Sequence, residues 1–221
     1  MTLTTILWDA GGVIYSFDQK KCDTRLAAAC GRTPEDVSKM LFGSSAEGRE
    51  YNAGLVEKFN LGKINELEFY YGVKETLGLS INYEQFVSAW TDIFTPNLEV
   101  MDLMKLFADI RIKQAILSST NPLHWQTMNT LFDLETLLGQ ENIVCTYHSG
   151  VGVKKGKPQL FDIVLGRIKK SKEEVVYVDD VKKYVDSAAE YGFGATVHVD
   201  IEQRDFQEKC IRKLQKLGFR L

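Results

Sequence analysis

Five short apolar runs recur along the chain, and each is too short for a typical helix and rich in β-branched residues. They cover residues 4–8, 112–118, 142–147, 174–178 and 195–199. Runs of this kind are typical of parallel strands that are buried on both faces. Amphipathic segments stand between the later runs, at 158–170 and 181–192. The alternation predicts an α/β, doubly wound (Rossmann-like) fold with a parallel five-stranded sheet and right-handed crossovers.

The stretch from Ser16 to Trp90 breaks this alternation, because its patterns are helical only. Thr33 followed by Pro34 is a helix start, with a capping hydroxyl and a proline in the first turn. The stretch follows the first strand directly, so we expect it to cover the crevice at the carboxyl ends of the strands and to exclude water there. We predict an α/β core domain of residues 1–15 and 91–221 and an inserted helical cap domain of residues 16–90.

Composition fits a globular protein with one ordinary α/β domain and a smaller appendage. The chain has 221 residues, of which 44% are hydrophobic and 26% are charged. Its net charge of -3 argues against a general nucleic-acid surface. The four cysteines, Cys22, Cys30, Cys145 and Cys210, form no C-x-x-C pair, so the sequence indicates neither a zinc site nor a disulfide framework, and we expect reduced thiols.

Targeting signals are absent from the sequence pattern. The start, MTLTTILWD, lacks the basic segment, apolar stretch and cleavage site of a secretory leader. No run approaches the roughly 18 apolar residues of a membrane span. We therefore expect a cytoplasmic protein, a monomer or homodimer, with no nucleic-acid or membrane partner.

Polar clusters follow four of the predicted strands, and their positions would converge on one crevice. They are Asp9, Ser118, the KKGKP loop at 154–158, and the pair Asp179 and Asp180. Each alone is explained by a cap, a turn or a solvated surface. Together, two carboxylates from adjacent strand ends form a hard oxygen site that suits Mg²⁺, while a lysine and a hydroxyl bind anionic oxygens. This combination suits phosphoryl transfer through an aspartyl-phosphate.

At these positions the chain resembles the haloacid dehalogenase-like superfamily of hydrolases, with four motifs spread over nearly its whole length. ILWDAGGVIY resembles the first motif, which implies that Asp9 is the nucleophile and a magnesium ligand and that the backbone carbonyl of Gly11 is another ligand. AILSSTN resembles the second motif, so Ser118 would bind phosphate. We place Ser119 and Gly12 in the substrate-binding set. The helical insert matches the family's cap after the first motif.

The third and fourth motifs supply the lysine and the remaining acids. GKPQLF resembles the third, which implies that Lys157 holds phosphate and nucleophile together. The KKGKP loop is one residue longer than common, so Lys154 and Lys155 are rivals, but Lys157 is favoured because proline follows it. VVYVDD resembles the fourth motif, which places Asp179 on magnesium and Asp180 in support of the metal shell.

Three positions depart from the family pattern. Ser119 and Tyr184 each stand where asparagine is usual or frequent. More important, Gly11 replaces the second aspartate of family phosphatases, which protonates the leaving oxygen and activates water. Such acid-base catalysis is typically worth about 10² to 10⁴ in rate, or roughly 3 to 5 kcal/mol. The stretch LSSTNPLHW nevertheless resembles the LSNTN-x-x-H pattern of a subgroup of sugar-phosphate phosphatases, members of which also have glycine here.

Replacement groups for the missing aspartate are few. Asp18, His124 or the substrate itself could supply a base. His124 falls in the first turn of the helix predicted after the second strand, from which it could reach the crevice, although a packing role is the commoner outcome for such a histidine.

The sequence therefore favours a magnesium-dependent phosphatase of a small phosphorylated metabolite, such as an anomeric sugar phosphate or an acyl phosphate. Two alternatives stay open. A dehalogenase or phosphonatase-like hydrolase would not need the second aspartate. The Asp179 and Asp180 pair, which suits a metal, counts against dehalogenation. A phosphonatase would need a lysine from the cap, for which Lys58 is the one candidate. A non-catalytic phospho-ligand binding protein is the other alternative.

Overall fold

The computed structural model describes residues 2–43, 54–199 and 205–219. Its main sheet is parallel and five-stranded, with the strand order β5-β4-β1-β6-β7. The strands are β1 (Thr5–Trp8), β4 (Lys113–Ser118), β5 (Ile143–Cys145), β6 (Val175–Asp179) and β7 (Ala195–His198). The expected fold class, an α/β doubly wound sheet, is confirmed.

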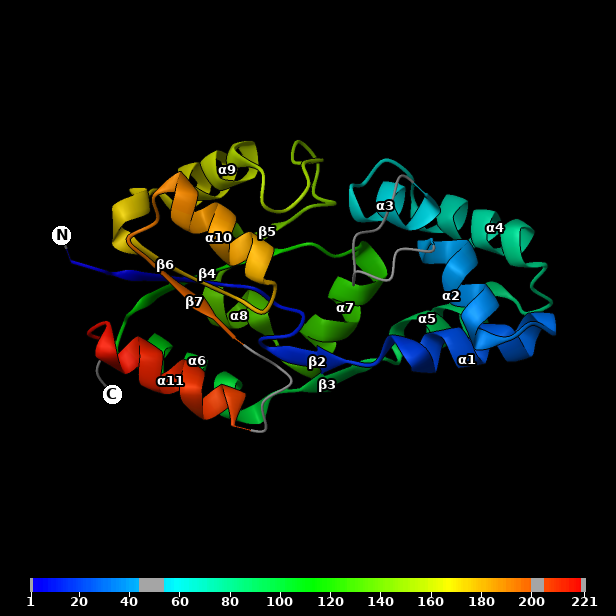
Figure 1. Ribbon diagram of the computed structural model, residues 1–221, viewed down its shortest axis with the longest axis horizontal. Helices are drawn as coiled ribbons and strands as arrows, with labels where there is room; N and C mark the ends of the chain where they lie inside the picture. Colours follow the sequence, from blue (N-terminus) through cyan, green and yellow to red (C-terminus); the bar gives the residue numbers. More distant parts are fainter. Residues whose placement is uncertain (1, 44–53, 200–204, 220–221) are drawn as a thin grey trace.

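Helices cover both faces of this sheet (Figure 1). They are α6 (Leu98–Asp109), α7 (Pro122–Leu131), α8 (Leu134–Leu138), α9 (Pro158–Ile168), α10 (Lys182–Tyr191) and α11 (Phe206–Lys216), with 3₁₀ turns at Gln140–Asn142 and Lys172–Glu174. Alternate residues of β1 face opposite layers, as a strand requires. Ile6 and Trp8 belong to the core shared with α6 and α11, whereas Leu7 belongs to the core shared with α9 and α10.

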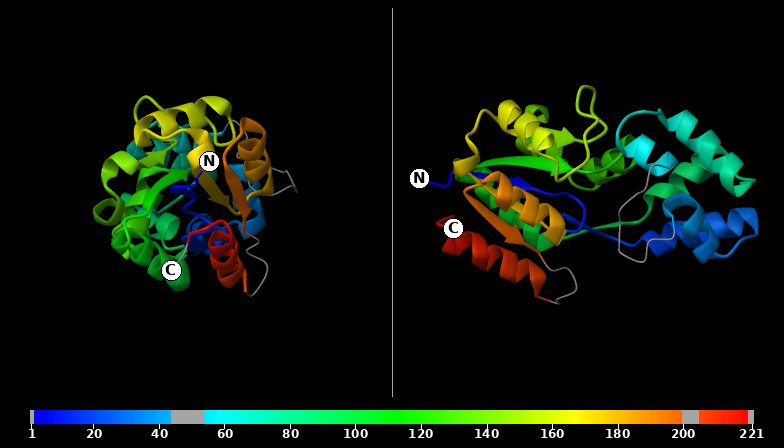
Figure 2. Two further views of the ribbon diagram at one scale, coloured as in Figure 1. Left: turned by 90° about the vertical axis from the view of Figure 1, so that its left-hand side faces the viewer. Right: turned by 45° about the horizontal axis from the view of Figure 1, so that its top comes forward.

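A separate helical unit stands beyond the carboxyl ends of the strands (Figures 1 and 2). It consists of α1 (Gln19–Cys30), α2 (Pro34–Phe42), α3 (Leu55–Asn60), α4 (Glu66–Leu77) and α5 (Tyr83–Thr91). The unit has its own hydrophobic core, centred on Phe59, Phe69 and Trp90. Thr33 accepts a hydrogen bond from the backbone N–H of Asp36 at 3.1 Å and Pro34 opens α2, as the sequence predicted.

The helical unit is joined to the sheet domain by a short antiparallel ribbon of β2 (Tyr15–Phe17) and β3 (Phe94–Pro96). Neither strand is predicted from the sequence, because three residues are too few to show a period. β2 begins six residues after Asp9, so the ribbon carries the chain from the end of β1 out to α1 and back again.

Buried polar contacts hold the helical unit against the sheet domain. Asn121, which caps α7, donates through Nδ2 to Oδ1 of Asn60 in α3 at 3.1 Å. Thr146 donates to the carbonyl oxygen of Asn60 at 2.7 Å. His124 of α7 contacts the carbonyl oxygen of Trp90 in α5 at 3.1 Å. These contacts attach the helical unit to the segments that follow β4 and β5.

The described residues include neither a membrane-spanning helix nor a disulfide. Among the described helices, none has the length and apolar character needed to cross a bilayer. All four cysteines are free thiols, in agreement with their spacing in the sequence.

Candidate active site

Asp9 lies immediately after β1 and is nearly buried, with 6% of its surface exposed. Its Oδ1 accepts a hydrogen bond from the backbone N–H of Ala10 at 2.6 Å and an ion pair from Nζ of Lys155 at 2.7 Å. In the described part of the chain no hydrogen bond uses its Oδ2. One oxygen therefore anchors the side chain while the other is left for chemistry.

Asp179 is the last residue of β6 and is fully buried. Its Oδ1 accepts from the backbone N–H of Val181 at 2.8 Å. Its Oδ2 accepts from Nζ of Lys155 at 2.7 Å and from the hydroxyl of Tyr177. β1 and β6 pair directly, with Leu7 opposite Tyr177, so Asp9 and Asp179 leave neighbouring strands on the same face. The sheet register is what brings the two carboxylates together.

Asp180 completes a cluster of three carboxylates with Asp9 and Asp179. One oxygen from each of these side chains lies within 4.8 Å of the others. Gly12 makes this possible: its φ is +86°, and a Cβ there would lie 2.2 Å from Oδ2 of Asp180. The absence of a side chain at Gly12 thus leaves room for the Asp180 carboxylate beside the other two. Three carboxylates this close together fit a magnesium ion, which takes few protein carboxylates and prefers oxygen.

The lysine of this cluster is Lys155, so the preference for Lys157 was wrong about which side chain enters the site. Lys155 is 5% exposed and bridges Asp9 and Asp179. Lys157 is exposed and occupies the N-cap position of α9. Lys154 is also turned away, and pairs with Glu57 of α3 at 2.8 Å.

The backbone of the 154–158 loop explains why Lys155, and not Lys157, enters the site. Pro158 opens α9, which fixes Lys157 at the helix start with its side chain in solvent. Gly156 has a φ of +84° and packs so closely on Tyr184 that a Cβ would lie 3.0 Å from the ring. This turn, which glycine adopts without strain, directs Lys155 back toward the sheet. Pro158 is the residue on which the prediction of Lys157 was based. The same proline starts α9 and thereby places Lys157 at the exposed end of that helix.

Burial and charge act against each other in this cluster. Burial raises the pKa of Asp9 well above its ordinary value, although Lys155 counteracts the rise. Burial disfavours the charged form of Lys155, but Asp179 and Asp9 outweigh it and hold the Lys155 pKa above its ordinary value. Burial, followed by Asp179, also raises the pKa of Tyr177, so its hydroxyl keeps its proton. The single positive charge of Lys155 offsets only part of the negative charge that three carboxylates can carry. The cluster therefore favours binding of a further cation.

A small cavity of about 60 Å³ is bordered by Gly11, two residues after Asp9, and is lined by residues of both the sheet domain and the helical unit. Ser118, at the end of β4, lines it together with Ser119 and Thr120. The predicted Ser118 and Ser119 are therefore placed at one cavity. Gly12 does not line this cavity and its N–H donates to the carbonyl oxygen of Tyr15 at 2.6 Å, so its role in substrate binding stays a prediction.

The cavity wall also contains residues that no sequence motif indicates. Phe17, Gln19, Ile93, Phe94 and Met128 line it. Gln19 supplies a polar group, and its Nε2 donates to Oδ1 of the nearly buried Asp23 at 3.1 Å. That contact holds the amide in place. Only the fold brings this first turn of α1 to the cavity, and no local motif marks it.

Gly11 borders the same cavity and adopts no left-handed φ. A Cβ at this position would lie 3.4 Å from Cε1 of Phe17, a contact at the edge of ordinary van der Waals distance. The backbone therefore admits an L-residue, and the aromatic ring of Phe17 stands closest to where its side chain would begin.

His124 lines the cavity, but both of its ring nitrogens are engaged. Nε2 faces the carbonyl oxygen of Trp90 and therefore carries the proton, while Nδ1 accepts from Nδ2 of Asn121 at 3.1 Å. Burial lowers the His124 pKa to about 4. The ring also stacks on Trp90, with centroids 5.2 Å apart. A neutral imidazole with both nitrogens bonded suits packing between α5 and α7 better than proton transfer.

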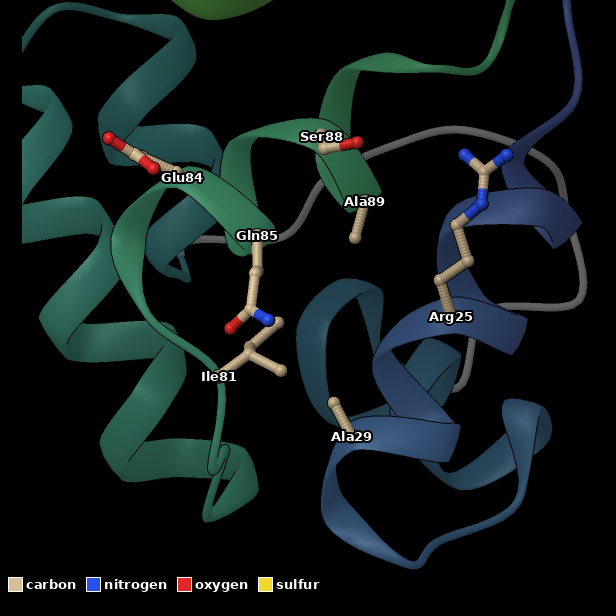
Figure 3. A pocket seen from close by; sticks show the side chains of 7 residues that line it. All are labelled: Arg25, Ala29, Ile81, Glu84, Gln85, Ser88 and Ala89. Atoms are coloured by element: carbon tan, nitrogen blue, oxygen red, sulfur yellow. The ribbon is translucent and has the colours of Figure 1, made fainter.

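A second, larger hollow is an open groove of about 480 Å³ on the helical unit (Figure 3). Arg25 and Ala29 of α1 and Glu84, Gln85 and Ser88 of α5 line it. Arg25 donates to the carbonyl oxygen of Asp92 at 2.9 Å, so its guanidinium is engaged at the groove's rim. All residues that line this groove belong to the helical unit, whereas the smaller cavity is bordered by Gly11, two residues after Asp9, and by Ser118 at the end of β4, so the smaller cavity is the better candidate for the chemistry.

The fold and the site define a Rossmann-like α/β protein with an acidic, lysine-containing crevice at the carboxyl ends of its strands. A family model for haloacid dehalogenase-like hydrolases matches residues 3–192, and the chain belongs to that family. No curated protein matches its sequence significantly.

Solved structures with the same fold are distant in sequence. The chain is 20% identical to an enzyme of this family from Bacteroides thetaiotaomicron, with a TM-score of 0.77 and coverage of 92% of this chain and 97% of that one. A mutant of that enzyme was solved with magnesium and inorganic phosphate, with 20% identity, a TM-score of 0.76 and coverage of 91% and 96%.

Two further structures span most of the chain. A HAD-like family hydrolase from Porphyromonas gingivalis is 19% identical, with a TM-score of 0.77 and full coverage of both chains. The L-2-haloacid dehalogenase of Xanthobacter autotrophicus is 18% identical, with a TM-score of 0.58 and coverage of 97% and 83%. These TM-scores show a shared fold.

Proposed function

We propose that the protein is a magnesium-dependent phosphatase that hydrolyses a small phosphorylated metabolite through an aspartyl-phosphate on Asp9. The observation that carries this proposal is the cluster in which Lys155 bridges Asp9 and Asp179 beside a cavity lined by Ser118. Magnesium and phosphate bound to the Bacteroides enzyme support it, because that enzyme has the same fold.

Asp9, Asp179, Asp180 and the backbone carbonyl of Gly11 would hold the magnesium ion. Bound there, the ion would offset the negative charge of a phosphoryl group beside the carboxylates. Lys155 and Ser118 would bind phosphoryl oxygens, with Ser119 at the edge of the cavity. Of the three loop lysines, we assign this role to Lys155, because it alone reaches Asp9 and Asp179.

The reaction would run in two displacements at phosphorus. The free Oδ2 of Asp9 forms a bond to phosphorus as the bond to the leaving oxygen breaks, and that oxygen departs with the electron pair. Water then attacks the phosphorus of the aspartyl-phosphate, the bond to Oδ2 breaks, and the carboxylate is restored as inorganic phosphate and a proton are released. Lys155 keeps Oδ1 fixed throughout.

The leaving group should need little protonation, because Gly11 supplies no acid. His124 does not replace it, since both of its nitrogens are bonded, and Asp18 is exposed and caps α1 by accepting from the N–H of Lys20. Carboxylates and anomeric oxygens leave more readily than alkoxides. We therefore propose an acyl phosphate or an anomeric sugar phosphate as substrate, with a leaving group small enough for the cavity.

We further propose that residues 16–90 form a cap and that residues 1–15 and 91–221 form the core domain. The separate hydrophobic core of α1–α5 and the position of that unit over the strand ends support this division. Phe17 and Gln19 would then contact the leaving group from the cap side, while the core supplies the phosphate-binding residues.

Dehalogenation is the second candidate, and Gly11 is the observation that favours it, because a halide leaves without a proton. The three clustered carboxylates favour phosphoryl transfer instead, since a negatively charged haloacid gains nothing from a cluster that attracts a divalent cation. Halide release in the same assays distinguishes the two reactions.

Magnesium dependence is the first expected result. Purified protein assayed against a panel of phosphorylated metabolites should release inorganic phosphate with magnesium present, and excess chelator should abolish that release, because three carboxylates cannot accommodate a phosphoryl group without a cation. Readdition of magnesium should restore it. Undiminished hydrolysis in excess chelator would remove the metal from the proposal, and ligand binding without turnover would favour the non-catalytic alternative.

Restoring the missing acid gives a second expected result. Gly11→Asp should raise the rate on an alkyl phosphate by roughly 10²-fold, and the rate on an acyl or anomeric phosphate much less, because only the alkoxide needs a proton. The backbone at Gly11 accepts aspartate, and the Phe17 ring is the side chain that must adjust. Gly11→Asn is the matched control, with similar size and no acid. Equal changes on both substrates would show that proton demand is not what glycine limits.

A further inference from the structure

Tyr177 lies in the middle of β6, two residues before Asp179, and is fully buried. Residues two apart in a strand project from the same face, so the ring lies beneath the site, in the core formed with α9 and α10. A tyrosine hydroxyl in such a place must find a hydrogen-bond partner within the protein. It donates to Oδ2 of Asp179.

The three donors to Asp179 leave it little freedom. Tyr177 and Lys155 occupy Oδ2, and the backbone N–H of Val181 occupies Oδ1. A carboxylate offers about four lone-pair directions, so roughly one remains for a cation. Two of the donors come from charged or backbone groups that any side chain at 177 would leave in place. The hydroxyl of Tyr177 is therefore the one contact at Asp179 that the residue type at position 177 decides.

The same ring contributes to the position of Lys155. Nζ of Lys155 lies 5.9 Å from the centroid of Tyr177 and 5.4 Å from that of Tyr184. A cation within about 6 Å of an aromatic ring is attracted to its face, and burial strengthens the attraction. The lysine is thus held by two carboxylates and two rings, and Tyr177 contacts both Lys155 and Asp179.

We propose that Tyr177 is a positioning residue whose hydroxyl fixes the orientation of Asp179 for magnesium and, through their shared contact with Lys155, aligns Asp9. This inference rests on the proposed function. Without the hydroxyl, the Asp179 carboxylate can rotate and its Oδ2 can bind Lys155 more closely. The carboxylate then spends less time in the orientation that binds the metal. Residues in contact with metal ligands commonly change metal affinity by about 10-fold to 100-fold when altered.

The experiment measures magnesium binding to the free protein by calorimetry, for the wild type, Tyr177→Phe and Tyr191→Phe. Tyr191 is a matched control, because its hydroxyl also donates to a carboxylate, that of Asp162, and its ring also packs on Phe161 and Phe193. Tyr177→Phe should weaken magnesium binding by about 10-fold or more, whereas Tyr191→Phe should leave it unchanged.

Excess magnesium should restore most of the kcat of Tyr177→Phe, which general structural damage would not allow. Equal magnesium affinity in Tyr177→Phe and the wild type would overturn the inference, while a wild type that binds no magnesium would overturn the proposed function instead. A measurement on the unaltered protein does not depend on the variant's folding: the buried hydroxyl proton of Tyr177, followed by proton NMR with labelled tyrosine, should shift during a magnesium titration. An unshifted resonance at saturating magnesium would also overturn the inference.

Discussion

Asp9→Asn is expected to lower kcat by about 10⁴-fold or more, which corresponds to about 5.4 kcal/mol of transition-state stabilisation. The amide is nearly isosteric with the carboxylate but is a poor nucleophile, and its oxygen carries no charge to attract a cation. The measurement is the steady-state rate with the best substrate, together with protein mass spectrometry of the reacting wild type. The wild type should show a mass increase equal to one phosphoryl group, and Asp9→Asn should not.

The fold should survive this substitution. Lys155 keeps its ion pair with Asp179, and loss of one acid reduces repulsion in a cluster that holds three acids and one lysine. Asp18→Asn is the matched control, since Asp18 is exposed and an asparagine side chain caps a helix equally well. Retention of most of the wild-type rate by Asp9→Asn would mean that no covalent intermediate forms on this residue.

Most of the sheet could be predicted because burial on both faces leaves a clear trace in sequence. All five apolar runs became strands of the main sheet within a few residues of the expected ends. Their carboxyl ends then placed Asp9, Ser118 and Asp179 at one edge without any knowledge of contacts. The ribbon of β2 and β3 could not be predicted from local patterns. Its three-residue strands are stabilised by pairing with each other and are too short to show a period.

The choice of lysine shows a different limit. Lys154, Lys155 and Lys157 stand within four positions, and which of them enters the site depends on a backbone turn. The φ of Gly156 and the packing of that glycine on Tyr184 decide the direction of the chain, and both follow from tertiary contacts. A resemblance based on the proline at 158 located the helix start correctly but assigned the adjacent side chain to the crevice.

Tyr177 was predictable in principle from strand alternation. It precedes Asp179 by two positions in a buried run, which places its side chain on the same face of the strand as that acid. Gln19 gave no such signal, because its place in the cavity depends on how α1 leaves the β2 and β3 ribbon. The site residues that follow the strands of the main sheet can therefore be predicted from the sequence, and those contributed by the helical unit cannot.

The lysines provide the second large effect. Lys155→Ala is expected to lower kcat/KM by about 10²-fold or more, whereas Lys157→Ala and Lys154→Ala should change it by less than about threefold. Nζ of Lys155 is buried and lies 2.7 Å from both Asp9 and Asp179, so its charge acts at low effective dielectric. Lys157 is exposed, where water and salt screen a charge, and the exposed Lys154 pairs with Glu57 of α3 and with neither Asp9 nor Asp179.

The reason for the loss can be separated from a loss of folding. Without Lys155, Asp9 and Asp179 repel each other and the phosphoryl group, so the variant should be less stable in chelator and should recover stability as magnesium is added. Thermal unfolding at several magnesium concentrations tests this, and small alkylammonium ions such as methylammonium should restore part of the rate by entering the space that Nζ leaves. If Lys157→Ala were the damaging substitution and Lys155→Ala were not, the loop would have to rearrange when substrate binds, exchanging the lysine that neutralises the acids at rest for the one that precedes Pro158.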